Sequence, residues 1–230
     1  MNNLKDYIVE SYSTKNILSI YDVYVQIKDP IENTQIQLDK ICLDVKRLLK
    51  KELLMNIDVI YIGVFEELEE KNVQALYKDR TIYLSNKIKT ESELIKNIIH
   101  EVAHSLEDIS YYENIVYGDN TLEQEFLMKR KTLFNILQSN GCEISNRLLL
   151  NTDYTKELDD FLYKFVGYNR LSGLLVGLVV SPYALTSLKE YFANGFEFLL
   201  YNKKQQHFLK QMCPVLYDKL DNLIYLDDYV

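Results

Sequence analysis

Residues 90–108 have the sequence TESELIKNIIHEVAHSLED, and this stretch predicts one long amphipathic helix. Thr90, followed three residues later by Glu93, matches the capping box that begins many helices. The apolar residues recur at the three- and four-residue spacing of one helix face; they are Leu94, Ile95, Ile98, Ile99, Val102, Ala103 and Leu106. The helix should therefore pack this face on a core and turn its other edge toward a cleft.

That other edge carries HEVAH at residues 100–104. At about 100° and 1.5 Å per residue, His100 and His104 lie about 40° and 6 Å apart, so both imidazoles can reach one ion. The Glu101 carboxylate projects beside them, where a general base is needed. The pattern predicts a zinc site with His100 and His104 as ligands and Glu101 as catalytic base. The alternative is two histidines packed or solvated on an ordinary helix.

The sequence around this helix predicts an α+β fold, in which a small twisted sheet packs on the helix and a mostly helical C-terminal half follows. Residues 57–64 and 80–85 are short and rich in β-branched residues and tyrosine, which predicts two strands. The strand near 81–85 is a plausible edge for pairing with an extended peptide. Helices are predicted at 38–53, 121–139, 155–166, 186–202 and, on either side of Pro214, 204–226.

The punctuation of the chain predicts a single domain over residues 1–230. Three prolines and seven glycines leave no linker, so an α/β part at about 1–110 and a helical part at about 111–230 should share one core. Three widely spaced cysteines without a CxxC arrangement are expected to be buried thiols. The sequence does not indicate an oligomeric state.

Composition argues against several classes of partner. The formal net charge of -8 and the lack of a long basic cluster give no footprint for nucleic acid, so none is expected. The longest apolar run, residues 171–180, is too short to span a membrane. The first sixteen residues lack the apolar core of a signal peptide, which predicts a cytoplasmic protein or one exported without a recognisable signal peptide.

A catalytic zinc ion usually takes three protein ligands and one water. A third motif histidine is excluded because position 110 is Ser110, which leaves a carboxylate. Residues 181–196, SPYALTSLKEYFANGF, supply Glu190 as the candidate. As an alternative, Ser187 and Glu190 form a capping box, in which the carboxylate would bind the Ser187 amide instead of a metal.

Residues 189–200, KEYFANGFEFLL, resemble the third-ligand helix of the zinc metallopeptidase family that contains the anthrax lethal factor catalytic domain and the Pro-Pro endopeptidases. In that family a tyrosine seven residues before the ligand Glu stabilises the transition state, and Tyr183 has this offset from Glu190. The resemblance covers about residues 57–210. It implies a zincin-like fold, one Zn²⁺ and endopeptidase activity on a peptide or protein substrate. The alternative for Tyr183 is packing beside Pro182.

The sequence departs from this family at two places. First, 86 positions separate His104 from Glu190, which is long for the family and predicts an inserted helical element near residues 140–180 that caps or reshapes the substrate groove. Second, Asn194 stands where the family often has an acidic residue that orients a ligand histidine. The further candidates for that orienting role are Glu197, Glu107 and Asp108.

Three other functions remain open at this point. One is a zinc-binding protein without peptidase activity, in which the same ligands stabilise the fold or the cleft recognises a partner. Another is a regulatory protein that cleaves one dedicated intracellular partner. The last is a toxin-like peptidase that is injected or secreted. The resemblance of a catalytic domain does not transfer a substrate, so the residues alone do not decide among these functions.

Overall fold

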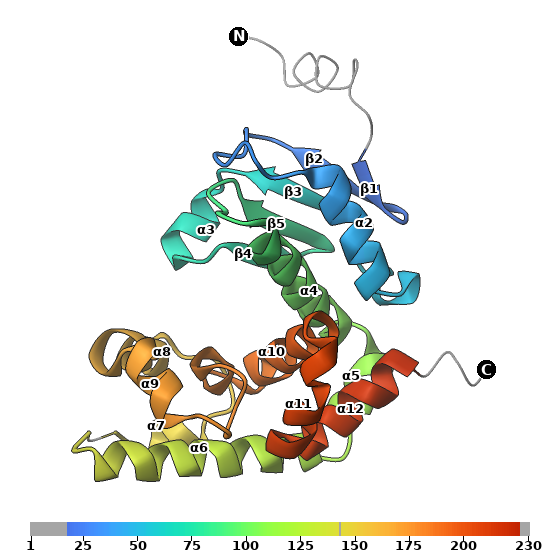
Figure 1. Ribbon diagram of the computed structural model, residues 1–230. Helices are drawn as coiled ribbons and strands as arrows, with labels where there is room; N and C mark the ends of the chain where they lie inside the picture. Colours follow the sequence, from blue (N-terminus) through green and yellow to red (C-terminus); the bar gives the residue numbers. More distant parts are fainter. Residues whose placement is uncertain (1–17, 143, 226–230) are drawn as a thin grey trace.

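The computed structural model describes residues 18–142 and 144–225 and has an α+β fold, with one mixed sheet beside a mostly helical remainder (Figure 1). This confirms the fold class expected from the sequence. The expectation about a signal peptide concerns residues that lie outside the described part. Within that part, none of the helices combines the length and the apolar character that crossing a membrane requires.

The sheet has the strand order β1-β2-β3-β5-β4. Its strands are β1 (Leu18–Ile20), β2 (Val23–Ile27), β3 (Val59–Gly63), β4 (Ala75–Lys78) and β5 (Thr81–Ser85). β2, β3 and β5 are parallel, while β1 and β4 pair antiparallel at the two edges. The sequence predicted only β3 and β5. The expectation of a free edge at 81–85 was wrong, because β5 pairs with both β3 and β4, and β4 is the edge strand.

The helices account for most of the chain after β5. They are α2 (Leu38–Leu48), α3 (Glu66–Lys71), α4 (Glu91–Glu107), α5 (Ser110–Tyr117), α6 (Thr121–Ser139), α7 (Asn146–Leu150), α8 (Lys156–Asp160), α9 (Tyr168–Leu174), α10 (Leu188–Tyr201), α11 (Gln206–Met212) and α12 (Pro214–Tyr225). Short helical turns are η1 (Lys51–Leu54), the π-helical η2 (Phe161–Val166), η3 (Pro182–Leu185) and η4 (Lys203–Gln205). The helix predicted at 155–166 is therefore divided. Helices α3 and α5 were not predicted, while α7 and α9 lie in the segment 140–180, which was predicted as a helical insert without individual bounds.

Helix α4 lies against the inner face of the sheet, beside α2 (Figure 1). All seven of its predicted apolar residues are buried, as are the inward residues of β3 and β5: Ile60, Ile62, Ile82 and Leu84. The Thr90 hydroxyl accepts a hydrogen bond from the Glu93 N–H at 3.1 Å, so the helix begins where the sequence predicted. The cap is not a full capping box, because the Glu93 carboxylate accepts from the Lys89 N–H and not from the Thr90 N–H.

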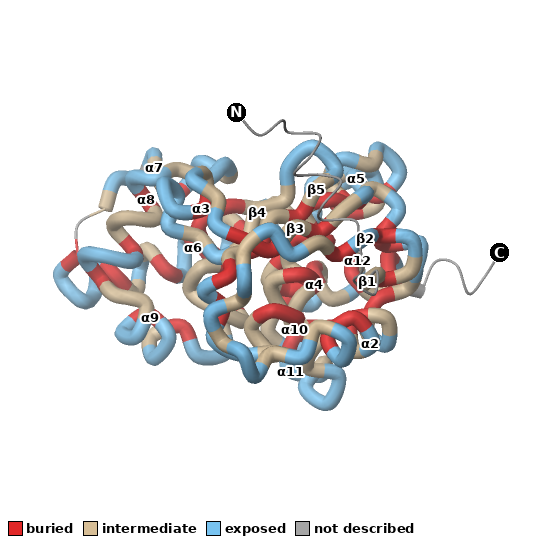
Figure 2. The backbone as a smooth tube through the Cα atoms, turned by 90° about the horizontal axis from the view of Figure 1, so that it is seen from above, coloured by how far each residue is buried: buried red, intermediate tan, exposed pale blue. Residues whose placement is uncertain are grey.

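Helix α10 packs along α4 on the side away from the sheet. The two helices are antiparallel, because Tyr201 near the end of α10 bonds to Ser92 near the start of α4, whereas Glu190 lies beside His104. Many of the buried residues lie in α4, in α10 and in the strands that α4 covers (Figure 2). This crossing brings residues almost ninety positions apart to one place.

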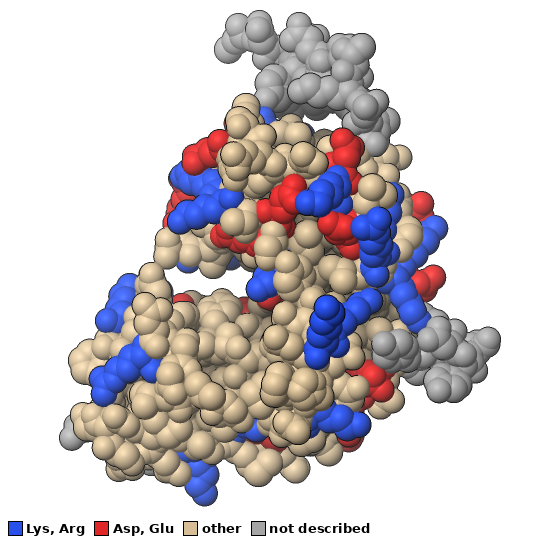
Figure 3. All heavy atoms as spheres, viewed as in Figure 1, with Lys and Arg blue, Asp and Glu red and all other residues tan. Residues whose placement is uncertain are grey.

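Residues 140–180, the segment expected as a helical insert, form α7, α8, η2 and α9. In Figure 1 they lie across from α3 and β4, and Figure 3 shows a hollow between these two parts of the surface. The segment therefore forms one wall of a cleft whose other wall is the edge of the sheet.

Candidate metal centre

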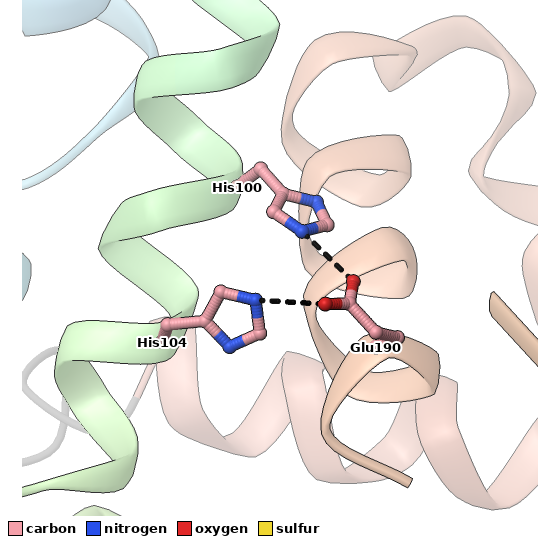
Figure 4. Close-up of side chains that lie close together, drawn as sticks. All are labelled: His100, His104 and Glu190. Atoms are coloured by element: carbon pink, nitrogen blue, oxygen red, sulfur yellow. Dashed lines mark hydrogen bonds and ion pairs between the residues drawn. The ribbon is translucent and has the colours of Figure 1, made fainter. Parts of the chain in front are cut away.

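Helices α4 and α10 direct three side chains toward one another (Figure 4). His100 Nε2 lies 3.0 Å from one carboxylate oxygen of Glu190, and His104 Nε2 lies 3.5 Å from the other. One ligand atom from each residue lies within 4.8 Å of the other two. The three side chains are 14–19% exposed, so they are partly shielded from water without being sealed in the core.

The spacing of these atoms suits a single zinc ion. Zinc binds imidazole nitrogen and carboxylate oxygen at about 2.0–2.2 Å, which puts neighbouring ligands of a tetrahedral site about 3.3 Å apart. The two nitrogen–oxygen separations, 3.0 and 3.5 Å, are close to this value, and each involves a different oxygen of the Glu190 carboxylate. Two histidines and one glutamate are also a donor set found in catalytic zinc sites. The residues present therefore fit the metal that the sequence predicts.

The three groups are strongly coupled by charge. Burial alone would lower the pKa of His100, but its hydrogen bond with Glu190 and the nearby carboxylate of Glu197 outweigh burial and raise the pKa to about 9. Burial likewise opposes the protonation of His104, whereas Glu107 and Glu190 raise its pKa to about 10. Burial would raise the pKa of Glu190, yet the two histidines hold it well below its usual range. Because a metal binds only neutral imidazole, metal binding at this site must compete with protons.

Glu101 is buried beside the histidines and is held by the edge strand. One of its carboxylate oxygens accepts a hydrogen bond from the Tyr77 backbone N–H at 2.6 Å. Burial raises the pKa of Glu101, and the nearby histidines partly offset this effect. A carboxylate with a raised pKa is a better proton acceptor and donor near neutral pH than an exposed one. This contact was not predicted, because the sequence did not indicate strand β4.

Two carboxylates lie beside the ring nitrogens that do not face Glu190. Glu107, whose side chain is 5% exposed, lies 3.5 Å from His104 Nδ1, and Glu197 lies 3.7 Å from His100 Nδ1. The Tyr117 hydroxyl donates to Glu107 at 2.6 Å and fixes that carboxylate. Such contacts set the tautomer of a ligand histidine and leave its other nitrogen for the metal. Both residues were predicted as candidates for this role, whereas Tyr117 was not.

The other two candidates for orienting a histidine lie elsewhere. Asn194 accepts a hydrogen bond from the Ser181 hydroxyl and donates to the Glu190 backbone carbonyl. Burial, followed by the Asp108 carboxylate, raises the pKa of the Tyr77 hydroxyl to about 12, which places Asp108 near β4. Glu190, Asn194 and Glu197 lie on one face of α10. Because α10 runs antiparallel to α4, Glu197 is the one beside His100 Nδ1. Asn194 is turned toward the start of η3.

Tyr183 lies in η3, and its hydroxyl donates to the Glu190 carboxylate at 3.3 Å. Burial and the charge of Glu190 raise the pKa of Tyr183 well above its usual range, so the group remains a protonated hydrogen-bond donor. The Ser187 hydroxyl caps α10 by accepting from the Glu190 N–H at 3.0 Å. The Glu190 carboxylate does not return to Ser187, as a capping box would require, but points to the histidines (Figure 4).

Comparison of the chain with known protein families, with curated proteins and with solved structures gave no match. The chemistry available at this site therefore follows from its own groups. Two imidazoles and a carboxylate can hold a cation, a second carboxylate can move a proton, and a phenol can donate to a developing negative charge.

Proposed function

We propose that this protein is a zinc-dependent endopeptidase with a zincin-like fold, in which His100, His104 and Glu190 hold one Zn²⁺. The observation that carries the proposal is the meeting of the two motif histidines with Glu190, at 3.0 and 3.5 Å, from helices far apart in the sequence. The packing of a mixed sheet on the motif helix, with its edge strand at the site, supports the zincin-like fold. A metal that only stabilised the fold would need neither Glu101 nor Tyr183.

A zinc ion at this site would supply a Lewis acid that activates water and polarises the scissile carbonyl. Glu101 accepts the proton of the attacking water and passes it to the departing amine. The hydrogen bond from Tyr77 fixes the Glu101 carboxylate beside the histidines, and burial brings its pKa closer to neutral. Glu107 and Glu197 keep the imidazoles in the required orientation.

Tyr183 is proposed as the group that stabilises the oxyanion of the tetrahedral intermediate. Its hydroxyl stays protonated over the whole working range of pH and lies beside the Glu190 carboxylate. A donated hydrogen bond strengthens as negative charge develops on the substrate oxygen, so the effect is on the transition state more than on substrate binding.

Replacing Tyr183 with Phe is expected to lower kcat about 100-fold while KM and zinc content change little, because one oxyanion donor is usually worth about 10²–10³ in rate. Steady-state kinetics on a fluorogenic peptide, together with metal analysis, would measure both. Tyr163→Phe is a matched control, because Tyr163 is 53% exposed and its one contact among the described residues is a ring contact with Tyr168. A kcat equal to that of the wild type in Tyr183→Phe would return Tyr183 to a packing role.

The substrate is proposed to be an extended peptide segment that pairs with β4. The Ser85 N–H donates to the Gln74 carbonyl, and antiparallel pairs alternate, so Ala75 and Tyr77 direct their backbone N–H and C=O groups to the free edge. The Tyr77 N–H is used by Glu101, which leaves the Tyr77 carbonyl and both Ala75 groups for a peptide. This edge borders the hollow in Figure 3.

The direct test is metal analysis of the purified protein combined with cleavage of a peptide library. We expect about one zinc per chain, cleavage of a subset of peptides, loss of cleavage with a chelator and its return with added zinc. A protein that holds no zinc, even when supplied with it, would contradict the proposal. Stoichiometric zinc without any cleavage would favour the alternative, a regulatory or catalytically silent zinc-binding protein that recognises one dedicated partner.

A further inference from the structure

Arg130 on α6 is a fully buried cation, with a side chain 0% exposed. Among the described residues it pairs with no carboxylate; its guanidinium stacks over the Phe126 ring, 4.6 Å from the centroid. Burial lowers its pKa to about 10, so the group still carries its charge at neutral pH. An unpaired buried charge is costly unless hydrogen bonds satisfy it, so its partners show what the residue does.

The guanidinium donates to backbone carbonyls of two separate segments. Nε donates to the Leu185 carbonyl at 2.9 Å and Nη2 to the Thr186 carbonyl at 2.6 Å. Nη1 donates to carbonyls of the segment 148–151, at 3.0 Å for Leu148 and also at Asn151. One planar group therefore holds the start of the 140–180 segment to the turn that precedes α10.

That turn separates two residues of the candidate site. Leu185 ends the helical turn that carries Tyr183, and the Thr186 hydroxyl donates back to the Tyr183 carbonyl at 2.8 Å. Ser187 then caps α10, whose third residue is Glu190. The Leu188 N–H donates to the Thr152 carbonyl at 2.8 Å, beside the segment that Arg130 binds. The guanidinium thus holds the backbone between Tyr183 and Glu190 and also the neighbouring segment 148–151.

We propose that Arg130 is a positioning residue of this site, which holds the Tyr183 turn and the start of α10 against residues 148–151. The inference rests on the proposed function. Arginine suits the role because it presents five N–H donors in a rigid plane, whereas the three donors of lysine radiate from one atom and cannot span both segments. It also gives residues 140–180 a role beyond forming a wall of the cleft, since their first part supports the active-site turn.

The test compares Arg130→Lys with Glu125→Gln. Glu125 is a buried carboxyl group on the same helix, but it accepts from the Tyr191 hydroxyl and from the backbone at the start of α12 instead of binding the turn that carries Tyr183. Both variants should lower the melting temperature. Only Arg130→Lys should lower kcat, by about 10- to 100-fold at saturating zinc with KM within about threefold, because a small misplacement of catalytic groups has effects of this size.

Amide hydrogen exchange supplies a readout that needs no activity. Arg130→Lys, but not Glu125→Gln, should speed exchange in both residues 148–152 and residues 182–190. In the wild-type protein these two segments should open as one unit, with the same dependence on denaturant, and this measurement does not require the variant to fold. Independent opening of the segments, or a kcat in Arg130→Lys equal to that of the wild type, would overturn the inference. If the wild-type protein neither bound zinc nor cleaved peptides, the proposed function would be refuted. The hydrogen-exchange comparison would then be the test of whether Arg130 holds the two segments together.

Discussion

Glu101→Gln is expected to abolish measurable peptide cleavage while the protein folds and holds one zinc ion as before. General acid–base groups contribute about 10²–10⁴ in rate, so kcat should fall by at least about 100-fold. The amide has nearly the shape of the carboxylate, and its carbonyl oxygen can still accept the hydrogen bond from the Tyr77 N–H. It cannot take a proton from water, however. Single-turnover cleavage of a peptide, zinc content and the melting temperature would separate these effects.

Glu93→Gln is the matched control for this variant, because Glu93 is on the same helix but contacts the Lys89 amide at its start, away from the histidines. It should retain wild-type activity. If Glu101→Gln cleaved as fast as the wild type, Glu101 would not be the base. If Glu101→Gln lost zinc together with activity, its role would be to support the site, and the assignment of a proton-transfer role would fail.

The motif helix could be predicted closely because its information is local. The apolar spacing and the Thr90 cap lie within one stretch, and α4 runs from Glu91 to Glu107 against an expected 90–108. Strands β1 and β4, which are three and four residues long, were missed, and so was β2, which has five residues like the predicted β3 and β5. Such short strands are defined by the neighbours they pair with, and pairing across a sheet leaves little periodic pattern in the sequence.

The site residues also differ in whether local sequence or distant contacts define them. His100 and His104 follow from the geometry of one helix, whereas Glu190 was reached through resemblance and an offset from Tyr183. The hydrogen bond from Tyr77, the contact of Tyr117 with Glu107 and the clamp formed by Arg130 depend on how distant segments cross. No spacing along the chain encodes them.

The groups around the site carry more negative than positive charge. Four carboxylates, those of Glu101, Glu107, Glu190 and Glu197, converge on two histidines. The Lys189 ammonium lies 3.4 Å from Glu107, so with both imidazoles protonated three positive charges would face four ionised carboxylates. Like charges raise one another's pKa unless a cation offsets them. A zinc ion would replace the two histidine protons with an equal charge at one point.

Glu190→Ala is accordingly expected to weaken zinc binding by more than about 100-fold, since loss of even an outer partner of a ligand usually costs 10- to 100-fold in affinity. The Glu190 N–H remains to bond with Ser187, so α10 should still begin in the same place. Competition with a chromogenic chelator would measure Kd, and circular dichroism would verify the fold.

Asn194→Ala is the control one turn along α10, because Asn194 bonds to Ser181 and to the Glu190 backbone instead of to a histidine. It should bind zinc about as tightly as the wild type. Wild-type affinity in Glu190→Ala would mean that another group completes the site, and the contact of the Glu190 carboxylate with both histidines would then be an ion pair without a metal.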